Sequence, residues 1–465
     1  MNSDVRKLKI CYIGGGSRNW AWVFMKDLAF EKDIAGTVYL YDIDQEAAKA
    51  NEVLGNQIMA AHNPGVWKFQ AEPSLEKTLA GSDFVFISIL PGDFEEMAVD
   101  VHAPEKYGIY QSVGDTVGAG GLNRALRTIP MYQEIGEAVK TWAPGAWVLN
   151  YTNPMSICTR TLYKVFPGIK AFGCCHEVFG TQKLLIKVLT RAGLVKEETI
   201  RREDIVTEVA GINHFTWITR AAWKNIDLFP LFAQFAGEFA ETGFAEGGDD
   251  NWFNSFFSSG ERVKIDLFRR YGLLAAAGDR HLAEFCPPSW YLKTPETAKE
   301  WQFSLTPVTW RISQREELKK KSEAYRRGTE IFTPENSGEE GIRQIKALLG
   351  LGNLVTNVNL PNQGQMPGFP PGAVVETNAF FSRDSVRPLI TGGLPNPIAG
   401  LVLQHIENQE GITEAAFERD LEKAFQVFQN DPQIRTLTRD AARELFKEMT
   451  AQTLSPSAGY RGLPG

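Results

Sequence analysis

The sequence has few of the features that mark membrane-spanning or nucleic-acid-binding proteins. It contains no run of about 18 consecutive apolar residues, the length that a transmembrane helix needs. Lys and Arg number 49 against 56 Asp and Glu, so the net charge is -7 and no basic surplus exists to neutralise phosphates. We therefore expect neither a membrane span nor a nucleic-acid partner.

Cysteine is scarce as well. The five cysteines are an odd number without the spacing of a disulfide framework, and no C-x-x-C pair is present for a structural zinc site. The N-terminal residues 1–7 lead into a strand-like segment and do not resemble a secretory signal. These absences predict unpaired thiols and a reducing, cytoplasmic location.

The remaining composition is typical of a globular protein, with 43% hydrophobic and 23% charged residues. A chain of 465 residues is long enough for two or three domains. Apolar strand-like segments alternate with helices until about residue 180, and the pattern then changes. We therefore predict one domain over residues 1–195 and a second, closely packed domain over residues 196–465.

The first strand, Lys9–Ile13, runs into the glycine-rich turn Gly14-Gly15-Gly16-Ser17. A helix is expected next, because Trp20, Phe24 and Leu28 recur at four-residue spacing. A strand, a glycine turn and a helix form the unit that cradles a dinucleotide, since only glycine lets the backbone approach a pyrophosphate at a helix N-terminus. For the glycines alone, a tight turn without a ligand is the competing interpretation.

Asp42 strengthens the nucleotide interpretation. It follows the second strand, Thr37–Tyr41, where an acidic residue binds the ribose of NAD and disfavours the 2′-phosphate of NADP. The pattern departs from G-x-G-x-x-G, because Asn19 stands at the third glycine. The two features together predict an NAD site at Gly14, Gly15, Gly16, Ser17 and Asp42.

Three further segments of the first half contain features that have either a functional or a purely structural interpretation. Phe84–Leu90 is a continuous apolar run, typical of a strand buried on both faces. The polar, glycine-rich segment Gln111–Arg127 is expected to be either a functional loop or a disordered connector. The strand Trp147–Leu149 ends in a turn whose Asn150 and Asn153 either bind hydroxyl groups or only stabilise the turn.

The second half is expected to mix helices and strands, with a charged helix that a capping box at Ser313 and Glu316 favours. The expected segments are helix Thr181–Ala192, strands in Ile205–Trp223, helices in Pro230–Tyr271, helix Ser313–Thr329, strands in Val355–Phe381, and helices Glu414–Phe428 and Arg439–Met449.

The segment Ala171–Val178 is the richest in chemistry, because a thiol, an imidazole and a carboxylate follow each other in it. Cys175, with His214 further along the chain, is a candidate metal ligand. A mixed Cys and His site with open positions suits a catalytic divalent ion. The alternative is that both side chains are ordinary buried residues.

Asp279 and His176 are candidates for a general base and a general acid. Tyr271 and His281 are rival bases, and Asp279 in a Gly-Asp-Arg-His sequence also fits a plain surface turn. No G-x-S-x-G pattern is present, so covalent acyl chemistry is not supported.

Taken in order, these motifs resemble glycoside hydrolase family 4 over nearly the whole chain. The motifs are Gly-Gly-Gly-Ser at 14–17, Tyr-Asp-Ile-Asp at 41–44, Thr-Asn-Pro at 152–154, Cys-His at 175–176, Gly-Ile-Asn-His at 211–214, Asn-Val-Asn-Leu-Pro-Asn at 357–362 and Ala-Val-Val-Glu at 373–376. The resemblance implies a Rossmann-type, doubly wound α/β sheet like that of lactate and malate dehydrogenases. It also implies a mixed α+β domain for substrate binding and homo-oligomerisation, as a dimer or tetramer.

The same resemblance implies roles for single residues. The cofactors would be NAD and a divalent metal, usually manganese, held by Cys175 and His214. His176 falls at the position of the acid, Asp279 at that of the base of α-acting members, and Asn153 at that of a sugar ligand, while other members use a tyrosine as base. In the implied reaction NAD oxidises C3, Asp279 removes the acidified C2 proton, the leaving group departs, water adds and the hydride returns.

The resemblance also favours one substrate class. Phospho-sugar members carry an arginine after the strand that here ends in Pro91-Gly92-Asp93, and Cys-His-Glu-Val at 175–178 resembles the α-galacturonidase branch. A small uronide or oligosaccharide is the expected substrate, its carboxylate bound by Arg280, Arg124 or Lys293. The alternatives are an NAD-dependent dehydrogenase of a sugar or hydroxy acid, and a family 4 glycosidase for a neutral α-glycoside.

Overall fold

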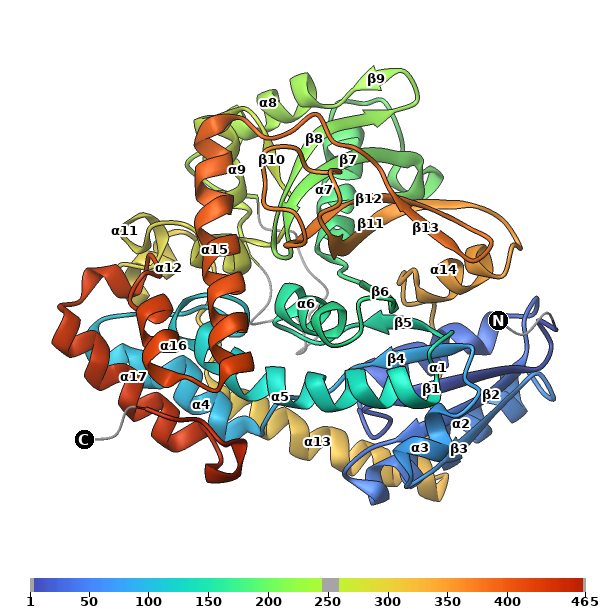
Figure 1. The fold of residues 1–465 in the computed structure, drawn as a ribbon. Helices are drawn as coiled ribbons and strands as arrows, with labels where there is room; N and C mark the ends of the chain where they lie inside the picture. Colours follow the sequence, from blue (N-terminus) through green and yellow to red (C-terminus); the bar gives the residue numbers. More distant parts are fainter. Residues whose placement is uncertain (1–3, 245–258, 463–465) are drawn as a thin grey trace.

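The structure, a computed structural model, describes residues 4–244 and 259–462 and is built around one mixed sheet (Figure 1). In the described residues the sheet has 13 strands, in the order β10-β8-β7-β12-β11-β6-β5-β4-β1-β2-β3, with β13 beside β12 and β9 beside β8. The strands β1 to β6 are parallel and lie in the order 3-2-1-4-5-6. This is the strand order of a Rossmann fold, so the predicted fold class is confirmed.

The strands have the following bounds: β1 Leu8–Ile13, β2 Gly36–Tyr41, β3 Trp67–Ala71, β4 Phe84–Ile87, β5 Trp147–Asn150, β6 Lys170–Gly173, β7 Ile205–Ile212, β8 Phe215–Trp223, β9 Ile226–Asp227, β10 Leu274–Ala275, β11 Leu354–Pro361, β12 Val374–Ser382 and β13 Ser385–Pro388. The strand β4 is shorter than the predicted Phe84–Leu90, and all four of its residues are buried between two helical layers.

The α-helices have the following bounds: α1 Trp20–Phe30, α2 Gln45–His62, α3 Leu75–Leu79, α4 Phe94–His102, α5 Gly118–Trp142, α6 Met155–Val165, α7 Glu177–Arg191, α8 Phe229–Glu238, α9 Arg262–Tyr271, α10 Asp279–Phe285, α11 Pro288–Tyr291, α12 Pro295–Glu300, α13 Val308–Arg327, α14 Gly341–Leu348, α15 Asn396–Glu418, α16 Leu421–Phe428 and α17 Arg439–Thr453. Of the predicted helical segment Pro230–Tyr271, residues 245–258 lie outside the described residues.

The two halves of the chain share the sheet. The strand β11 pairs antiparallel with β6, with Asn359 opposite Gly173. The predicted boundary between residues 195 and 196 therefore divides the chain but not the sheet. Helices of the second half also cover the first: α13 crosses below the parallel strands, and α15 to α17 lie at the outer end of α5 (Figure 1).

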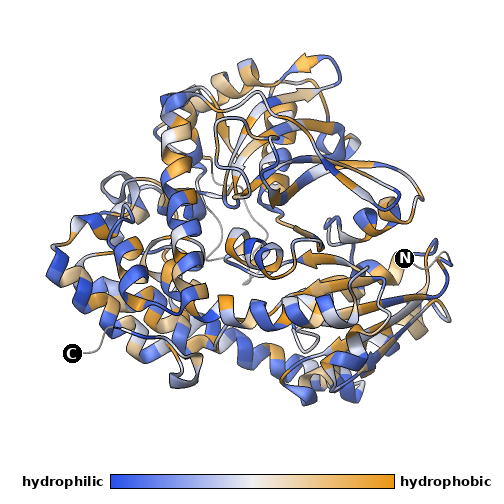
Figure 2. Cartoon of the chain, viewed as in Figure 1, coloured by the Kyte–Doolittle hydropathy of each residue, from blue (hydrophilic) through white to orange (hydrophobic). Residues whose placement is uncertain are grey.

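The hydrophobic pattern explains this layering. The strands are largely apolar, whereas the outer helices alternate between hydrophilic and hydrophobic residues (Figure 2). In the strand β7, Val206 and Glu208 are exposed near the start, and the last four residues are buried where the hairpin enters the interior. One face of the strand is therefore exposed at its start, and both faces are buried at its end. Such a strand runs from the surface towards the centre of the molecule.

Only the first part of the glycine-rich segment Gln111–Arg127 is a loop, and it is packed against its neighbours rather than being a disordered connector. The helix α5 begins at Gly118, and the segment before it is held by Gln111, whose amide nitrogen donates to the Asp100 carbonyl. A β-carbon at Gly120 would lie 2.5 Å from the Gly114 carbonyl oxygen. The glycine therefore serves close packing rather than flexibility.

The capping box predicted at Ser313 is also wrong. The helix α13 begins at Val308, and the Ser313 hydroxyl lies inside it and donates to the Thr309 carbonyl. The helix begins earlier because Val308 packs against Met97 and Val101, a contact that the local sequence does not reveal.

The predicted helix Glu414–Phe428 is two helices. The helix α15 ends at Glu418, Arg419 adopts a left-handed conformation, and the Asp420 side chain then caps α16 by accepting from Lys423 N.

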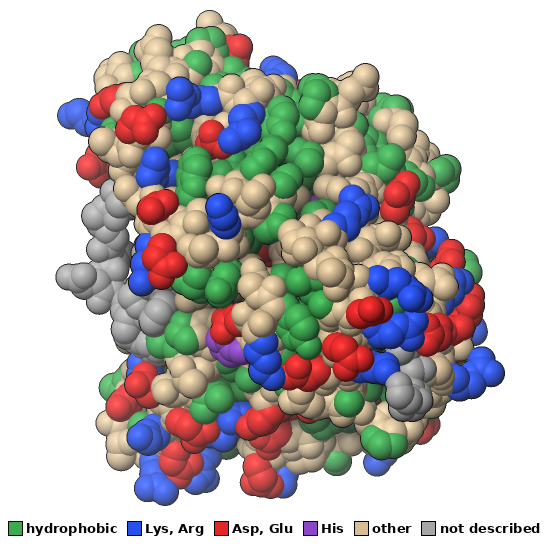
Figure 3. Space-filling model, turned by 90° about the vertical axis from the view of Figure 1, so that its left-hand side faces the viewer, with side chains coloured by type: hydrophobic (Ala, Val, Ile, Leu, Met, Phe, Trp, Pro, Cys, Tyr) green, Lys and Arg blue, Asp and Glu red, His purple; other side chains and the backbone are tan. Residues whose placement is uncertain are grey.

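The surface of the molecule agrees with the modest net charge. Basic and acidic side chains are intermixed over the face in Figure 3. Each helix of residues 4–244 and 259–462 is too short or too polar to cross a lipid bilayer.

His405 makes the stability of the fold sensitive to acid. It is buried on α15, and its Nε2 donates to the Phe285 carbonyl at 2.9 Å. Burial lowers the pKa of His405 from 6.5 to about 4. Below pH 6.5 the unfolded chain gains a proton that the folded chain does not, so stability falls between pH 6.5 and pH 4.

When the pH falls from 7.5 to 5, the free energy of unfolding of the wild type should decrease because of His405. We expect this decrease to be about 2 kcal/mol smaller in His405→Gln than in the wild type. The amide keeps a donor for Phe285 but does not titrate. Urea denaturation at the two pH values measures the difference. His62→Gln, at an exposed position on α2, is the matched control and should behave as the wild type. Equal losses in the wild type and His405→Gln would contradict the assignment.

Candidate functional site

The candidate site lies at the carboxyl ends of the parallel strands, where open α/β sheets bind ligands. The glycine turn follows β1, Asn153 follows β5 and Cys175 follows β6. The β7–β8 turn, with His214, and the start of α10 close the site from the second half of the chain. The continuous sheet thus places residues from both halves at one edge.

The glycine turn has the shape that a dinucleotide requires. Gly14 has a φ of 92°, and a β-carbon there would lie 2.0 Å from the Ser88 carbonyl oxygen. Gly16 N donates to Asp42 Oδ2 at 2.8 Å, and burial raises the pKa of Asp42. The turn and the carboxylate therefore form one unit, which fits the phosphate and ribose parts of NAD.

Asn51 on α2 holds this turn in place, and the sequence patterns missed it. Its buried side-chain amide donates to the Gly15 and Ser17 carbonyls, and its oxygen accepts from the Trp22 indole at 2.8 Å. The Ser17 hydroxyl accepts from the backbone nitrogen of Trp20, the first residue of α1, at 3.1 Å. No sequence motif identifies Asn51, because its role depends on a contact across 36 residues.

A second group of side chains has the composition of a metal site. Asp115, His214 and His281 each offer one ligand atom, and these atoms lie within 4.8 Å of one another. The two imidazole rings are 3.7 Å apart between centroids. The Thr116 hydroxyl lies 3.0 Å from His214 Nδ1 and orients that ring. One carboxylate and two imidazoles suit a divalent transition metal.

The charges in this group favour metal binding. Burial raises the pKa of Asp115, but the neighbouring His and Arg side chains outweigh burial and lower the pKa to about 2. Burial and the adjacent His281 lower the pKa of His214 to about 3. The carboxylate is therefore ionised and the imidazole neutral at pH 7, the states in which both donate a lone pair to a cation.

Of the two predicted metal ligands, His214 is in this group. Cys175 lies at the end of β6, near the Asn213 side chain, and burial raises the pKa of its thiol. Asp115 was missed, although it stands in the glycine-rich segment that was expected to be functional. His281 was considered only as a rival base.

Glu376 holds the strands that carry these residues together. It is buried on β12, where its carboxylate accepts from Thr216 at 2.7 Å and from the Asn357 amide at 2.6 Å. Asn357 also donates to the Cys175 carbonyl at 3.2 Å. One carboxylate thus connects β8, β11 and the end of β6, and it fixes the surroundings of Cys175.

His176 lies at the opening of the site, with half of its side chain exposed. Its Nδ1 is 3.1 Å from Glu339 Oε1, and its ring packs against Trp20 in a tilted arrangement with 5.6 Å between the centroids. Burial lowers the pKa of His176, but the hydrogen bond to Glu339 outweighs burial, and the net shift is upwards.

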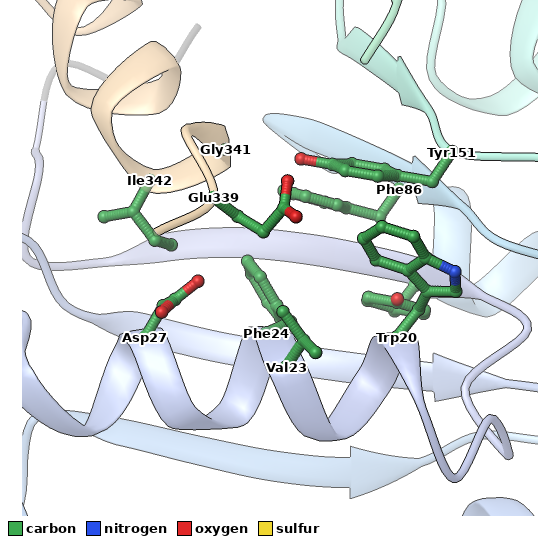
Figure 4. Close-up of a pocket in the computed structure, with 10 residues that line it drawn as sticks. Trp20, Val23, Phe24, Asp27, Phe86, Tyr151, Glu339, Gly341 and Ile342 are labelled. Carbon is green, nitrogen blue, oxygen red and sulfur yellow. The ribbon is translucent and has the colours of Figure 1, made fainter. Parts of the chain in front are cut away.

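Glu339 comes from the loop before α14 and was not foreseen. It lines a narrow pocket together with Trp20, Tyr151 and Asp27 (Figure 4). In that view its carboxylate points towards the Tyr151 hydroxyl. Glu339, which contacts His176, therefore also lines a pocket against the α1 residues Trp20 and Asp27.

Asp279 is at the start of α10, and it is completely buried. Its Oδ1 accepts from Lys264 N at 3.0 Å, so this oxygen faces the first turn of α9 rather than the Asp115 group. Burial and the nearby Glu261 raise the pKa of Asp279 to about 7. Tyr271, the rival base, packs at the end of α9 against Trp217.

The predicted substrate ligands divide into two sets. Asn153 and Arg124 are in the site: the Asn153 amide is 3.4 Å from Asp115 Oδ2, and Arg124 Nε donates to the Asn153 carbonyl. Arg280 is beside them, where it donates to Ser304 O at 3.0 Å and also to Thr306. Lys293 is exposed in the segment between α11 and α12.

Comparison with known proteins gives consistent matches along the chain. The family model described as family 4 glycosyl hydrolase matches residues 9–191, and the model of its C-terminal domain matches residues 209–434. A relative from Thermoanaerobacterium saccharolyticum, named alpha-galacturonidase, is 56% identical over 99% of this chain and 98% of its own.

Two solved structures are also similar. The protein lplD of Bacillus subtilis, provisionally described as a glucosidase, has a TM-score of 0.90 at 51% identity, covering 95% of this chain and 99% of its own. A 6-phospho-alpha-glucosidase from gut microorganisms, solved with NAD and Mn²⁺, has a TM-score of 0.80 at 22% identity, covering 96% and 98%. The second likeness establishes the fold only.

The Asp115 group yields a direct test of metal binding. We expect Asp115→Asn and His281→Gln each to weaken Mn²⁺ affinity at least about 10-fold, because each variant removes or weakens a ligand atom. Titration of the protein with Mn²⁺, followed by electron paramagnetic resonance, measures the affinity. Asp93→Asn, at a largely exposed carboxylate that pairs with Arg315, is the matched control. Unchanged affinity in both variants would contradict the site, and Cys175→Ser tests whether the thiol is a further ligand.

Proposed function

The chain belongs to family 4 of the glycosyl hydrolases and hydrolyses α-glycosides, and from this premise we propose that its substrates are α-galacturonides. The main support is the 56% identity, over nearly the full length, to a protein named alpha-galacturonidase. The arginines near Asp115 support a substrate with a carboxylate.

We propose NAD and a divalent cation, preferably Mn²⁺, as cofactors. The turn Gly14–Ser17 and Asp42 would hold NAD, and the Asp115 group, with Cys175 nearby, would hold the cation. When bound, NAD supplies a reversible hydride acceptor for C3 of the sugar, and the cation supplies a Lewis acid for the adjoining oxygens.

The chain itself supplies the proton transfers. We propose that His176 gives a proton from Nε2 to the departing glycosidic oxygen, while Glu339 holds Nδ1 and keeps the ring oriented. Asp279 remains the proposed base for the C2 proton, because a pKa of about 7 suits a group that takes up and releases a proton near neutral pH. His281, the rival, lies in the Asp115 group.

The arrangement of the chain suggests a division of roles. We propose that residues 1–195 bind NAD and that residues 196–465 complete the substrate site and mediate homo-oligomerisation in the cytoplasm. The alternatives are a net NAD-dependent dehydrogenase and a glycosidase for neutral α-glycosides. They differ from the proposal in the fate of NADH and in the substrate preferred.

The proposal predicts the dependence on substrate and cofactor. We expect p-nitrophenyl α-galacturonide to be cleaved about 10- to 150-fold faster than the α-galactoside or a 6-phospho-α-glucoside, since a charged hydrogen-bonded contact contributes about 1.5–3 kcal/mol. Cleavage should require NAD and Mn²⁺ while the NADH absorbance stays flat. Equimolar NADH accumulation would favour the dehydrogenase, and faster turnover of the galactoside would favour the neutral glycosidase.

The proposed base chemistry has an isotopic signature. Hydrolysis in heavy water should place deuterium at C2 of the galacturonate product, because removing the C2 proton exposes that carbon to solvent. Proton NMR of the product measures the exchange. Asp279→Asn should bind NAD and Mn²⁺ as the wild type does but turn over at least about 100-fold more slowly, because an amide does not accept the proton. Full retention of hydrogen at C2 in the NAD-dependent reaction would overturn the mechanism.

A further inference from the structure

Glu284, near the end of α10, is a buried acid that takes no part in the proposed proton transfers. Its Oε1 accepts from Val113 N at 2.7 Å and from Gly114 N at 2.9 Å. These two residues come directly before Asp115 in the chain. A carboxylate that accepts from two consecutive backbone nitrogens forms strong hydrogen bonds and fixes the path of the chain. Glu284 therefore determines where the chain enters Asp115.

A second contact joins the same loop to the same helix. The Ser112 hydroxyl donates to the Arg280 carbonyl at 2.5 Å, and the Arg280 guanidinium donates to the Ser112 carbonyl. Arg280 comes directly before His281, which belongs to the candidate metal group together with Asp115. The loop and the helix are thus joined next to each of these two ligands. The distance between Asp115 and His281 consequently depends on this junction.

The chain is also held on the other side of Asp115. The Thr116 hydroxyl donates to Asp115 Oδ1 at 2.6 Å and lies 3.0 Å from His214 Nδ1. Gly118, the first residue of α5, donates from its backbone nitrogen to Asp431 Oδ2 at 3.3 Å. The short segment that carries Asp115 is therefore fixed at both ends, and Glu284 supplies the contacts at the first end.

The two carboxylate oxygens of Glu284 are used unequally. Oε1 makes both contacts to the backbone nitrogens. Oε2 is buried and has no hydrogen-bond partner among residues 4–244 and 259–462. The junction thus depends on one acceptor oxygen, which an amide side chain also offers, and not on a second oxygen or on the negative charge.

We propose that Glu284 is a positioning residue for the divalent cation. By holding Ser112–Gly114 against α10, it sets the distance between Asp115 and His281 and so determines how tightly the cation binds. The inference rests on the proposed function, which assigns the cation to the Asp115 group. Side chains that orient metal ligands change metal affinity about 10- to 100-fold when they are replaced.

Three variants separate this action from a general effect on the fold. Glu284→Ala removes the acceptor, whereas Glu284→Gln keeps an oxygen with two lone pairs for the same backbone nitrogens. Asp420→Ala is the matched control, because the Asp420 carboxylate also accepts from a backbone nitrogen, that of Lys423, at 3.0 Å. That contact is at the start of α16, which is not part of the candidate site.

The experiment titrates the full chain, loaded with NAD, with Mn²⁺ and follows binding by electron paramagnetic resonance. We expect Glu284→Ala to raise the dissociation constant of Mn²⁺ about 10- to 100-fold. Glu284→Gln should stay within about threefold of the wild type, because the acceptor is retained. Asp420→Ala should bind Mn²⁺ as the wild type does.

A double-mutant cycle with Asp115→Asn tests whether Glu284 acts through Asp115. In the Asp115→Asn background, Glu284→Ala should raise the dissociation constant by less than about threefold, because the ligand that it positions is already impaired. A general structural effect would produce the same factor in both backgrounds, since independent effects on the free energy of binding add.

Unchanged Mn²⁺ affinity in Glu284→Ala would overturn the inference. An equal loss in the Asp115→Asn background would also overturn it, and so would a loss in Glu284→Gln as large as that in Glu284→Ala. If Glu284→Ala does not fold, Glu284→Asp takes its place in the same cycle, because its side chain is one carbon shorter. Mn²⁺ binding is measured without substrate. A wild type that shows this coupling but does not cleave the galacturonide would therefore refute the proposed function and leave this inference standing.

Discussion

The pairing of β6 with β11 is the contact on which the rest of the structure depends. The first strands build a nucleotide-binding sheet, and Gly173 at the end of β6 receives Asn359 of the second half as its partner. The approach is close: a β-carbon at Gly173 would lie 2.8 Å from the Met155 side chain and 3.0 Å from the Asn359 β-carbon. Because the sheet continues across this pair, β12 and the β7–β8 hairpin lie beside the carboxyl ends of the parallel strands. Without that pairing, Cys175 and His214 would belong to separate structures.

The second constraint is electrostatic. The site buries acids, imidazoles and guanidinium groups together, and each keeps its charge state because of the others. Burial raises the pKa of Glu177, but the surrounding imidazoles outweigh burial and lower the pKa to about 2. Glu177 in turn accepts from Gly278 N at 2.7 Å and so holds the start of α10, which carries His281. A buried charge that loses its partner is costly, so substitutions in this cluster affect stability as well as chemistry.

The sequence predicted what depends on local signals. The Rossmann half follows from short apolar strands, the glycine turn and Asp42, and the fold class is confirmed. The boundaries of α13 were missed because its start depends on Val308 packing against Met97, two residues that are distant in sequence. Asp115 was missed for the same reason, since it joins the candidate metal group through neighbours that only the fold supplies. The assignments of Cys175, His176 and Asp279 came from family resemblance and stay predictions, and the contact of Asp279 with Lys264 gives the base assignment its sharpest test.

The two halves contribute differently to the chemistry, and this follows from how they are built. The cofactor side rests on backbone geometry: glycines without β-carbons, and strand ends fixed by the parallel sheet. The substrate side that we propose rests on side chains of α10 and the β7–β8 turn, which reach the same sheet edge from outside the parallel strands. A side-chain change on α10 therefore leaves the glycine turn in place, whereas a change at Gly14 forces the backbone apart at Ser88. Substitutions can accordingly change the substrate preference more easily than cofactor binding, because cofactor binding depends on the backbone of the sheet.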